Sequence, residues 1–180
     1  CHMPLQSGAD SMLRRMKRLY TRESFGEIVA SLRRAVPGIG LTTDLIVGFP
    51  GETEEEYEAT LDAVREYRFD GAFCFAYSPR PGTPAAVYEE QLDPGLKNER
   101  LRRLIALQES ITGEINEALV GAIFEVLIEG PSSKNPERMQ GFTREGRMMH
   151  FAASPDRVGR LARVRAVGAH RWGLSGELHG

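Results

Sequence analysis

The spacing of apolar residues changes once along this sequence, and that change most constrains the fold. Up to about residue 90, stretches with helical spacing alternate with short apolar runs, whereas after Gly121 apolar residues recur at every second position. Alternating strands and helices predict a parallel sheet, and several short strands without helices predict a small β-barrel. We therefore expect two domains, an α/β domain over residues 1–113 and an all-β domain over residues 114–180.

Capping residues delimit the helices expected in the first domain. Asp10 is expected to cap a short helix over SMLRRMKR, and Thr21 is expected to cap a second helix. Thr53 and Glu56 have the spacing of a capping box in front of a third helix, EEEYEATLDAVREY. These three helices alternate with the apolar runs.

Two apolar runs, IGLTTDLIVGF and FDGAFCFAYS, are expected to be buried strands, the first covered on both faces. The segment YSPRPGTPAA follows the second run, and its prolines exclude a helix or a central strand there. The domain is too short to close a full barrel, so we interpret it as the second half of a (β/α) barrel.

A long amphipathic helix is expected from Pro94 to about Leu119, with Arg100, Arg102 and Arg103 mainly outward. We interpret it as a packing helix that joins the two domains.

Polar residues and glycines occur together where three expected strands end. In α/β folds ligands bind at the carboxyl ends of the parallel strands. The candidate ends are residues 6–8, 48–52 and 77–83, where glycine permits a close approach of the backbone. The sequence contains no GKS/T phosphate loop, no hydrolase triad and no paired histidines, which argues against nucleotide hydrolysis.

The charge is unevenly distributed. The chain has a net charge of −2, yet residues 139–180 hold seven arginines, no lysine and three acidic residues, a net charge of +4. This asymmetry indicates a polyanion partner, and the alternative is a solvated basic face. Four arginines of this region are expected to alternate along strands: Arg144, Arg147, Arg163 and Arg165. Phe142 and Phe151 beside them are either stacking surfaces for bases or core residues.

Composition limits the remaining possibilities. No apolar run approaches a membrane span and no signal-peptide pattern is present, so we expect a cytoplasmic protein without membrane contact. The two cysteines, Cys1 and Cys74, exclude a disulfide framework and a multi-cysteine metal site made by this chain alone. Because the chain opens CHMPLQSG without an initiator methionine, we expect it to be the C-terminal portion of something longer.

Several motifs, in order, resemble those of one family. HMPLQSGADSMLRRM, TTDLIVGFPGETEEEY and YSPRPGTPAA resemble successive motifs of the radical S-adenosylmethionine (SAM) methylthiotransferases. VLIEGPSSKNPERMQGFTREGRMMHF and WGLSGEL resemble the TRAM domain, an RNA-binding barrel. The resemblance implies the C-terminal half of a radical SAM (β/α) barrel followed by a small, OB-like TRAM barrel.

The resemblance also implies a reaction. Arg80-Pro81 together with EGPSSKNP resembles the branch that adds a methylthio group to carbon-2 of isopentenyladenosine next to the anticodon of tRNA. The alternatives are the branch acting on threonylcarbamoyladenosine in tRNA, the branch acting on a ribosomal protein, and, in another class, a non-catalytic RNA-binding module.

Such enzymes use SAM and two 4Fe-4S clusters, one of them held by a CxxxCxxC motif. That motif and the auxiliary-cluster cysteines are absent here, so the resemblance implies a fragment without metal ligands or catalytic residues that is inactive alone. The implied partners are the anticodon stem-loop of tRNA, through the TRAM domain, and the missing N-terminal domain of the same protein.

Matching the family motifs position by position implies cofactor contacts at the strand ends. Gln6 and Ser7 match the motif that approaches the ribose of SAM, and Ile46 and Gly48, with Glu52 nearby, match the motif beneath the adenine.

Tyr77 and Ser78 sit at the last strand end and complete the implied cofactor site, while Arg80 is expected to hold a carboxylate or a tRNA phosphate. The implied RNA contacts of the second domain are Arg144, Arg147, Arg163 and Arg165.

Overall fold

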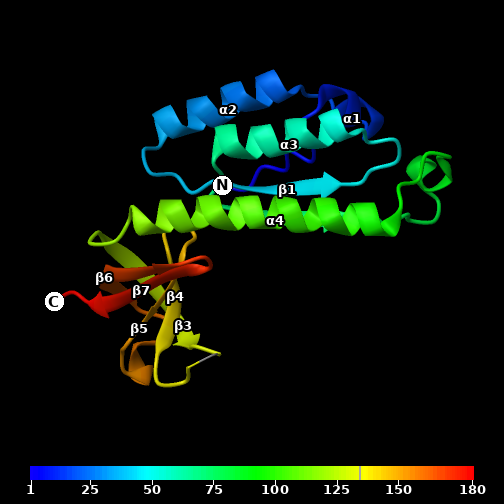
Figure 1. Ribbon diagram of the computed structural model, residues 1–180. Coiled ribbons are helices and arrows are strands. Elements are labelled where there is room, and N and C mark those ends of the chain that lie inside the picture. The colour runs from blue at the N-terminus through cyan, green and yellow to red at the C-terminus, as the bar shows by residue number, and fades with distance from the viewer. Residues whose placement is uncertain (134) are drawn as a thin grey trace. The chain divides into compact units, whose positions relative to one another are not determined.

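The computed structural model describes residues 1–133 and 135–180 and divides the chain into two compact units, Cys1–Ile111 and Thr112–Gly180 (Figure 1). Each unit has its own architecture. The first is α/β and the second is a β-barrel, as the change of apolar spacing predicts.

Parallel strands form the centre of the first unit. Strands β1 (Thr42–Val47) and β2 (Gly71–Ala76) pair in parallel over their whole length. The N-terminal segment runs parallel to β1 through bridges from His2 to Thr42 and from Gln6 to Leu45. The predicted parallel arrangement is therefore confirmed, and the carboxyl ends of three extended segments lie at one edge.

Three helices accompany these strands: α1 (Asp10–Arg15), α2 (Arg22–Ala35) and α3 (Glu54–Tyr67). In Figure 1, α2 and α3 run side by side along one side of β1. Their predicted caps are confirmed, because the hydroxyls of Thr21 and Thr53 accept hydrogen bonds from backbone N–H groups three residues later.

The predicted cap of the first helix is wrong. Ala9 occupies the cap position of α1 and offers no side-chain bond there. Asp10 is the first helical residue, and its carboxylate accepts a 2.8 Å hydrogen bond from the backbone N–H of Arg22, the first residue of α2. Asp10 stands in the sequence where a helix cap is expected, but its carboxylate binds the backbone at the start of the next helix, α2.

One face of the sheet is open. Leu45 and Val47 are fully buried, whereas Phe73 and Phe75 on the neighbouring strand are 61% and 52% exposed. The expectation that β2 is a buried strand is therefore wrong for this unit, and so is the expectation that β1 is covered on both faces, since its residues alternate between buried and half-buried. The helices cover the face of Leu45, and Phe73 and Phe75 point to the opposite one, since they lie opposite Asp44 and Ile46 in the register.

Two elements follow β2. A short 3₁₀ helix, η1 (Pro84–Val87), lies in the proline-rich loop, and α4 (Pro94–Glu117) is the predicted long helix. The carboxylate of Asp93 accepts hydrogen bonds from the N–H groups of Gly95 and Leu96 and so caps the start of α4. Arg102 and Arg103 are exposed as predicted, but Arg100 is 3% exposed, so its predicted outward position is wrong.

The second unit is a closed five-stranded barrel in the order β3-β4-β5-β7-β6. Its strands are β3 (Ile123–Pro131), β4 (Met139–Thr143), β5 (Met148–Phe151), β6 (Leu161–His170) and β7 (Gly173–Leu178), with a 3₁₀ turn, η2 (Pro155–Arg157), before β6. All pairs are antiparallel except β5 with β7. The hairpin turn predicted at Glu145-Gly146 is confirmed by a φ of 82° at Gly146.

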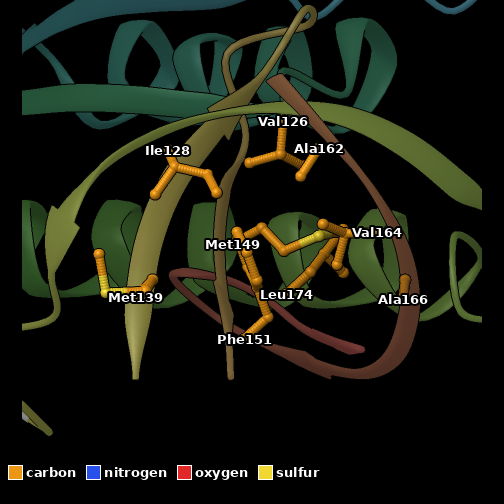
Figure 2. Close-up of a cluster of buried hydrophobic side chains, with 9 residues drawn as sticks. All are labelled: Val126, Ile128, Met139, Met149, Phe151, Ala162, Val164, Ala166 and Leu174. Atoms are coloured by element: carbon orange, nitrogen blue, oxygen red, sulfur yellow. The ribbon is translucent and has the colours of Figure 1, made fainter. Parts of the chain in front are cut away.

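Alternate residues of these strands fill the barrel (Figure 2). Phe151 is fully buried among them, so its stacking role is wrong and its core role is right. The buried cluster consists of Val126, Ile128, Met139, Met149, Phe151, Ala162, Val164, Ala166 and Leu174. Among the described residues, no helix of either unit is long and apolar enough to cross a membrane.

Candidate functional site

A cavity of about 690 Å³ opens at the carboxyl ends of the strands in the first unit. This volume is typical of small-molecule sites. Five of the predicted site residues line it, from all three strand ends: Gln6, Ile46, Tyr77, Ser78 and Arg80. Ser7, Gly48 and Glu52 are not among the lining residues, so the structure separates the predicted set into two groups.

Gln6 owes its place to an unusual backbone conformation. Its φ is +72°, in the left-handed region that few non-glycine residues adopt. Its N–H donates to the carbonyl of Asp44 at 2.8 Å, and its carbonyl accepts from the N–H of Ile46 at 2.9 Å. The two bonds fix Gln6 beside β1 where the chain turns away from the sheet.

Ser7 and Gly8 face a helix rather than the cavity. The hydroxyl of Ser7 lies 3.2 Å from that of Thr60, which also accepts a 3.0 Å hydrogen bond from the N–H of Gly8. A Cβ at Gly8 would lie 2.2 Å from the carbonyl oxygen of Ala59. The close approach that this glycine permits is therefore to α3, and a cofactor contact of Ser7 stays a prediction.

The loop after β1 is closed by a buried carboxylate. One oxygen of Glu52 accepts a 2.7 Å hydrogen bond from the N–H of Gly48, and the side chain of Glu52 is fully buried. Burial raises the pKa of Glu52, while the Gly48 N–H and the nearby Arg100 guanidinium act in the opposite direction. Glu52 thus shapes the loop, and its predicted place near the adenine stays a prediction.

Arg100 of α4 is the partner of this carboxylate. Its guanidinium donates to the Glu52 carboxylate at 2.8 Å, to the Glu52 carbonyl at 3.0 Å and to the carboxylate of Glu54 at 2.9 Å. The Tyr57 hydroxyl donates to the carbonyl of Arg100, and burial raises the pKa of Tyr57 to about 12. Sequence reasoning missed this contact, and the acidic run Glu54–Glu56 was the only local signal of a cationic neighbour.

Lys97, one turn earlier on α4, contacts two strand-end loops. Its ammonium donates a 3.2 Å hydrogen bond to the carbonyl of Tyr77. Its stem covers Gly48, because a Cβ on that glycine would lie 2.3 Å from Cγ of Lys97. Together with Arg100, it makes α4 a support for the loops after β1 and β2.

Aromatic rings form one wall of the cavity. The ring of Phe49 lies edge to face with Tyr77, at 5.0 Å between centroids, and with Tyr88, at 6.4 Å. The buried hydroxyl of Tyr77 has no hydrogen-bond partner within the part of the chain that the structure describes. A buried hydroxyl without a partner is costly, so a ligand that bonds to it would gain affinity.

Basic residues that sequence reasoning did not single out also line the cavity. They come from the end of α1 and the turn after it: Arg15, Lys17 and Arg18. Arg15 forms an ion pair with Glu90 at 3.1 Å, and its guanidinium lies over the ring of Tyr88.

The four predicted RNA-binding arginines of the barrel fall into two groups. Arg144 and Arg147 lie in the turn between β4 and β5, so the expectation that they alternate along a strand is wrong. Arg163 and Arg165 occupy exposed, alternate positions of β6, as expected.

Their neighbours differ as well. Arg144 is 2.8 Å from the carboxylate of Glu125, to which it is both bonded and ion-paired. Arg165 donates to the carbonyl of Gly121 and lies 3.4 Å from the ring of His179. Arg163 stands opposite Glu125 in the strand register. A role in RNA binding stays a prediction for all four arginines, Arg147 included.

No group of three histidine, cysteine or acidic side chains suited to a metal ion occurs among the described residues. Cys1 is exposed, and burial raises the pKa of Cys74 to about 11, so its thiol is protonated at neutral pH.

Comparison with known proteins defines the class of this cavity-bearing unit. Residues 1–64 match the family model described as the Radical SAM superfamily. The match includes β1 and most of α3, so the first unit is similar to part of a radical SAM protein.

Particular relatives cover nearly the whole chain. Over 177 residues, 98% of the chain, it is 52% identical to the tRNA-2-methylthio-N(6)-dimethylallyladenosine synthase of Moorella thermoacetica. Proteins of the same name from Alkaliphilus oremlandii and Anoxybacillus flavithermus are 44% and 45% identical over the same share. The chain spans 40%, 38% and 34% of these three relatives. The resemblance to the radical SAM methylthiotransferases is thereby confirmed.

Proposed function

We propose that this chain is part of a tRNA methylthiotransferase that adds a methylthio group to carbon-2 of isopentenyladenosine next to the anticodon. The observation that carries the proposal is the 52% identity, continuous across both units, to a protein named for that product. The alternatives, a threonylcarbamoyladenosine enzyme, a ribosomal-protein enzyme and a non-catalytic RNA-binding module, are not favoured by the names of these relatives.

The cavity of the first unit is the proposed SAM site. Bound to a reduced 4Fe-4S cluster, SAM would supply the radical that removes hydrogen from carbon-2 of the substrate base. The residues present fit this cofactor, because Ile46 and the aromatic wall offer apolar contact to an adenine and the Tyr77 hydroxyl has an unused bond. Gln6 and Ser78 would supply the polar contacts.

The chain would contribute binding and positioning rather than the cluster. It has two cysteines, so it does not itself carry the CxxxCxxC motif and the auxiliary-cluster cysteines of the family. We infer that both clusters of the complete enzyme are held by residues outside this sequence and that this chain alone does not cleave SAM.

The β-barrel is the proposed RNA-binding part, a TRAM domain for the anticodon stem-loop. The exposed arginines of β6 support this proposal, because cations at alternate strand positions suit the spaced phosphates of a nucleic acid. We place the boundary between the radical SAM part, 1–113, and the TRAM part, 114–180, within α4, and the site of action in the cytoplasm.

Nucleoside analysis of tRNA tests this proposal. Deleting the gene that encodes this chain should remove the 2-methylthio group from isopentenyladenosine, and restoring the intact gene should return it. Unchanged methylthiolation in the deletion strain would exclude the proposal, and loss from threonylcarbamoyladenosine instead would favour the other tRNA branch.

A variant of the intact enzyme separates the substrate from the cofactor. Arg80 lines the cavity and is exposed, so Arg80→Glu should lower tRNA modification while SAM cleavage continues. Equal loss of both activities would place Arg80 in the cofactor site instead.

A further inference from the structure

Three cations from two distant parts of the chain converge on the cavity of the first unit. Lys17 and Arg18 follow α1, Arg80 follows β2, and all three line the same cavity. We propose that they form one site for a phosphate of the RNA backbone, which would hold the substrate nucleotide over the cavity. This inference rests on the proposed function and extends it to Lys17 and Arg18, which the sequence motifs do not single out.

The charges at this site are not balanced by the protein. Lys17, Arg18 and Arg80 are exposed, and none of them forms an ion pair within residues 1–133 and 135–180. Asp44 is the one acidic side chain among the described lining residues, and its carboxylate lies 3.4 Å from the ring of His2. The mouth of the cavity is therefore positive, which attracts an anion.

Arg15 provides an internal comparison. It lines the same cavity, yet its guanidinium is ion-paired with Glu90 and lies over the ring of Tyr88. Its cation already has a partner, so we exclude Arg15 from the proposed phosphate site.

The backbone at Lys17 is held in a conformation that a lysine rarely adopts. Its φ is +59°, at the end of α1, where glycine or asparagine is the usual residue. The Lys17 N–H donates to the carbonyl of Arg14 at 3.0 Å, and the Arg18 N–H donates to that of Leu13 at 2.8 Å. A long cationic side chain in a glycine-type position has no local structural advantage, so its advantage is expected to lie in binding.

The rest of the cavity favours a nucleotide over a simple anion. Phe75, 52% exposed, and Tyr77 line it together with Arg80, so aromatic rings and cations occur in one cavity. Aromatic rings stack on unpaired bases while lysine and arginine bind the adjoining phosphates. The carboxylate of a cofactor is the other possible source of the same negative charge, and it is distinguished by experiment.

The test uses the 180-residue chain and two double variants of equal charge. Lys17→Gln with Arg18→Gln removes two cations of the proposed site. Arg14→Gln with Arg34→Gln removes two exposed cations that are not among the lining residues of the cavity. Binding of a labelled anticodon stem-loop RNA is measured by fluorescence anisotropy over a series of salt concentrations, and binding of SAM is measured by calorimetry.

We expect the Lys17/Arg18 variant to bind the RNA about tenfold more weakly than the control and to lower the salt slope by about 0.7 to 0.9, the value for one lost phosphate contact. SAM affinity should be the same in both variants. A salt slope equal to that of the control overturns the site, and so does a loss confined to SAM affinity, which would assign the anion to the cofactor.

Failure of the proposed function gives a different result. If the unaltered chain binds an unrelated stem-loop of equal length as tightly as the anticodon stem-loop, the tRNA substrate is in doubt. The phosphate site would still stand if the Lys17/Arg18 variant weakened both RNAs relative to the control.

Discussion

The guanidinium of Arg100 lies 2.8 Å from the carboxylate of Glu52, although 48 positions separate the two residues in the chain. Both side chains are almost fully buried, at 4% and 0% exposure. Because the same carboxylate holds the N–H of Gly48, this pair connects α4 to the loop after β1. The geometry of the cavity edge therefore depends on a helix that contributes little to the cavity lining itself.

Breaking this pair should destabilise the first unit. Arg100→Met leaves the Glu52 carboxylate buried without its cation, and we expect the free energy of unfolding to fall by about 3–5 kcal/mol. Adding Glu52→Gln should recover part of the loss, because the neutral amide oxygen still accepts from Gly48. Urea unfolding followed by far-ultraviolet circular dichroism measures both variants.

A matched control lies two positions along the same helix. Arg102 is exposed, and Arg102→Met should change the free energy of unfolding by no more than about 0.5 kcal/mol. Equal effects at Arg100 and Arg102 would contradict a structural role of the buried pair.

Glu52 should also leave a signature in the pH dependence of stability. Burial raises the pKa of Glu52 in the folded chain above the ordinary glutamate value of 4.5, so the folded state binds this proton more tightly than the unfolded state does. The stability that protonated Glu52 adds to the folded state is therefore fully present below pH 4.5 and is lost as the pH rises through the raised pKa. Glu52→Gln should lack that decline, and urea midpoints at a series of pH values compare the two proteins. Parallel pH profiles would contradict the raised pKa.

Gly48 and Lys97 should be energetically coupled. Gly48→Ala places a methyl group 2.3 Å from Cγ of Lys97 at a φ of +70°, and we expect a loss of about 1–3 kcal/mol. Combining it with Lys97→Ala removes the contacts with Cγ and Cδ and leaves Cβ of residue 97 at 3.2 Å together with the backbone strain, which costs about 1 kcal/mol. Stability measurements on all four members of the cycle give the coupling energy.

Gly38→Ala separates strain from clash in this experiment. Gly38 has a φ of +79° with no atom within 4 Å of the added methyl group. It should show the strain alone, without coupling to Lys97. A Gly48→Ala loss no larger than that of Gly38→Ala would rule out the contact with Lys97.

Arginines of the barrel should differ in their effect on RNA binding. Arg163→Gln should weaken binding and lower the salt slope by about one unit, whereas Arg144→Gln should have less effect because Glu125 already neutralises Arg144. Anisotropy titrations with the anticodon stem-loop at several salt concentrations measure both. The opposite order would indicate that Arg144 leaves Glu125 when RNA binds.

Local signals in the sequence were reliable where the interaction is itself local. The capping boxes at Thr21 and Thr53 involve residues three positions apart, and both are present. Asp10 shows the limit of that reasoning, because its carboxylate bonds to Arg22, twelve positions away.

Burial of particular side chains was less predictable. Helical spacing and charge predict an exposed Arg100, and nothing near it in sequence reveals the buried carboxylate that it meets. In the same way, the aromatic run of β2 predicts a buried strand, but Phe73 and Phe75 are exposed. The spacing of apolar residues does not show whether one or both faces of a sheet are covered. The cavity residues were found where strand ends could be located, and the cations after α1 were missed because no strand precedes them.

The parallel pairing of β5 with β7 has a consequence for how the second unit folds. The hairpins β4–β5 and β6–β7 can form early, since their registers join residues close in sequence, but the ring closes only when β7 pairs in parallel with β5. Until then, β5 and β7 each expose a row of unpaired backbone groups, which is a known route to intermolecular strand addition. Slow formation of this one parallel pair, rather than weak packing of the core, would then set the tendency of this barrel to aggregate.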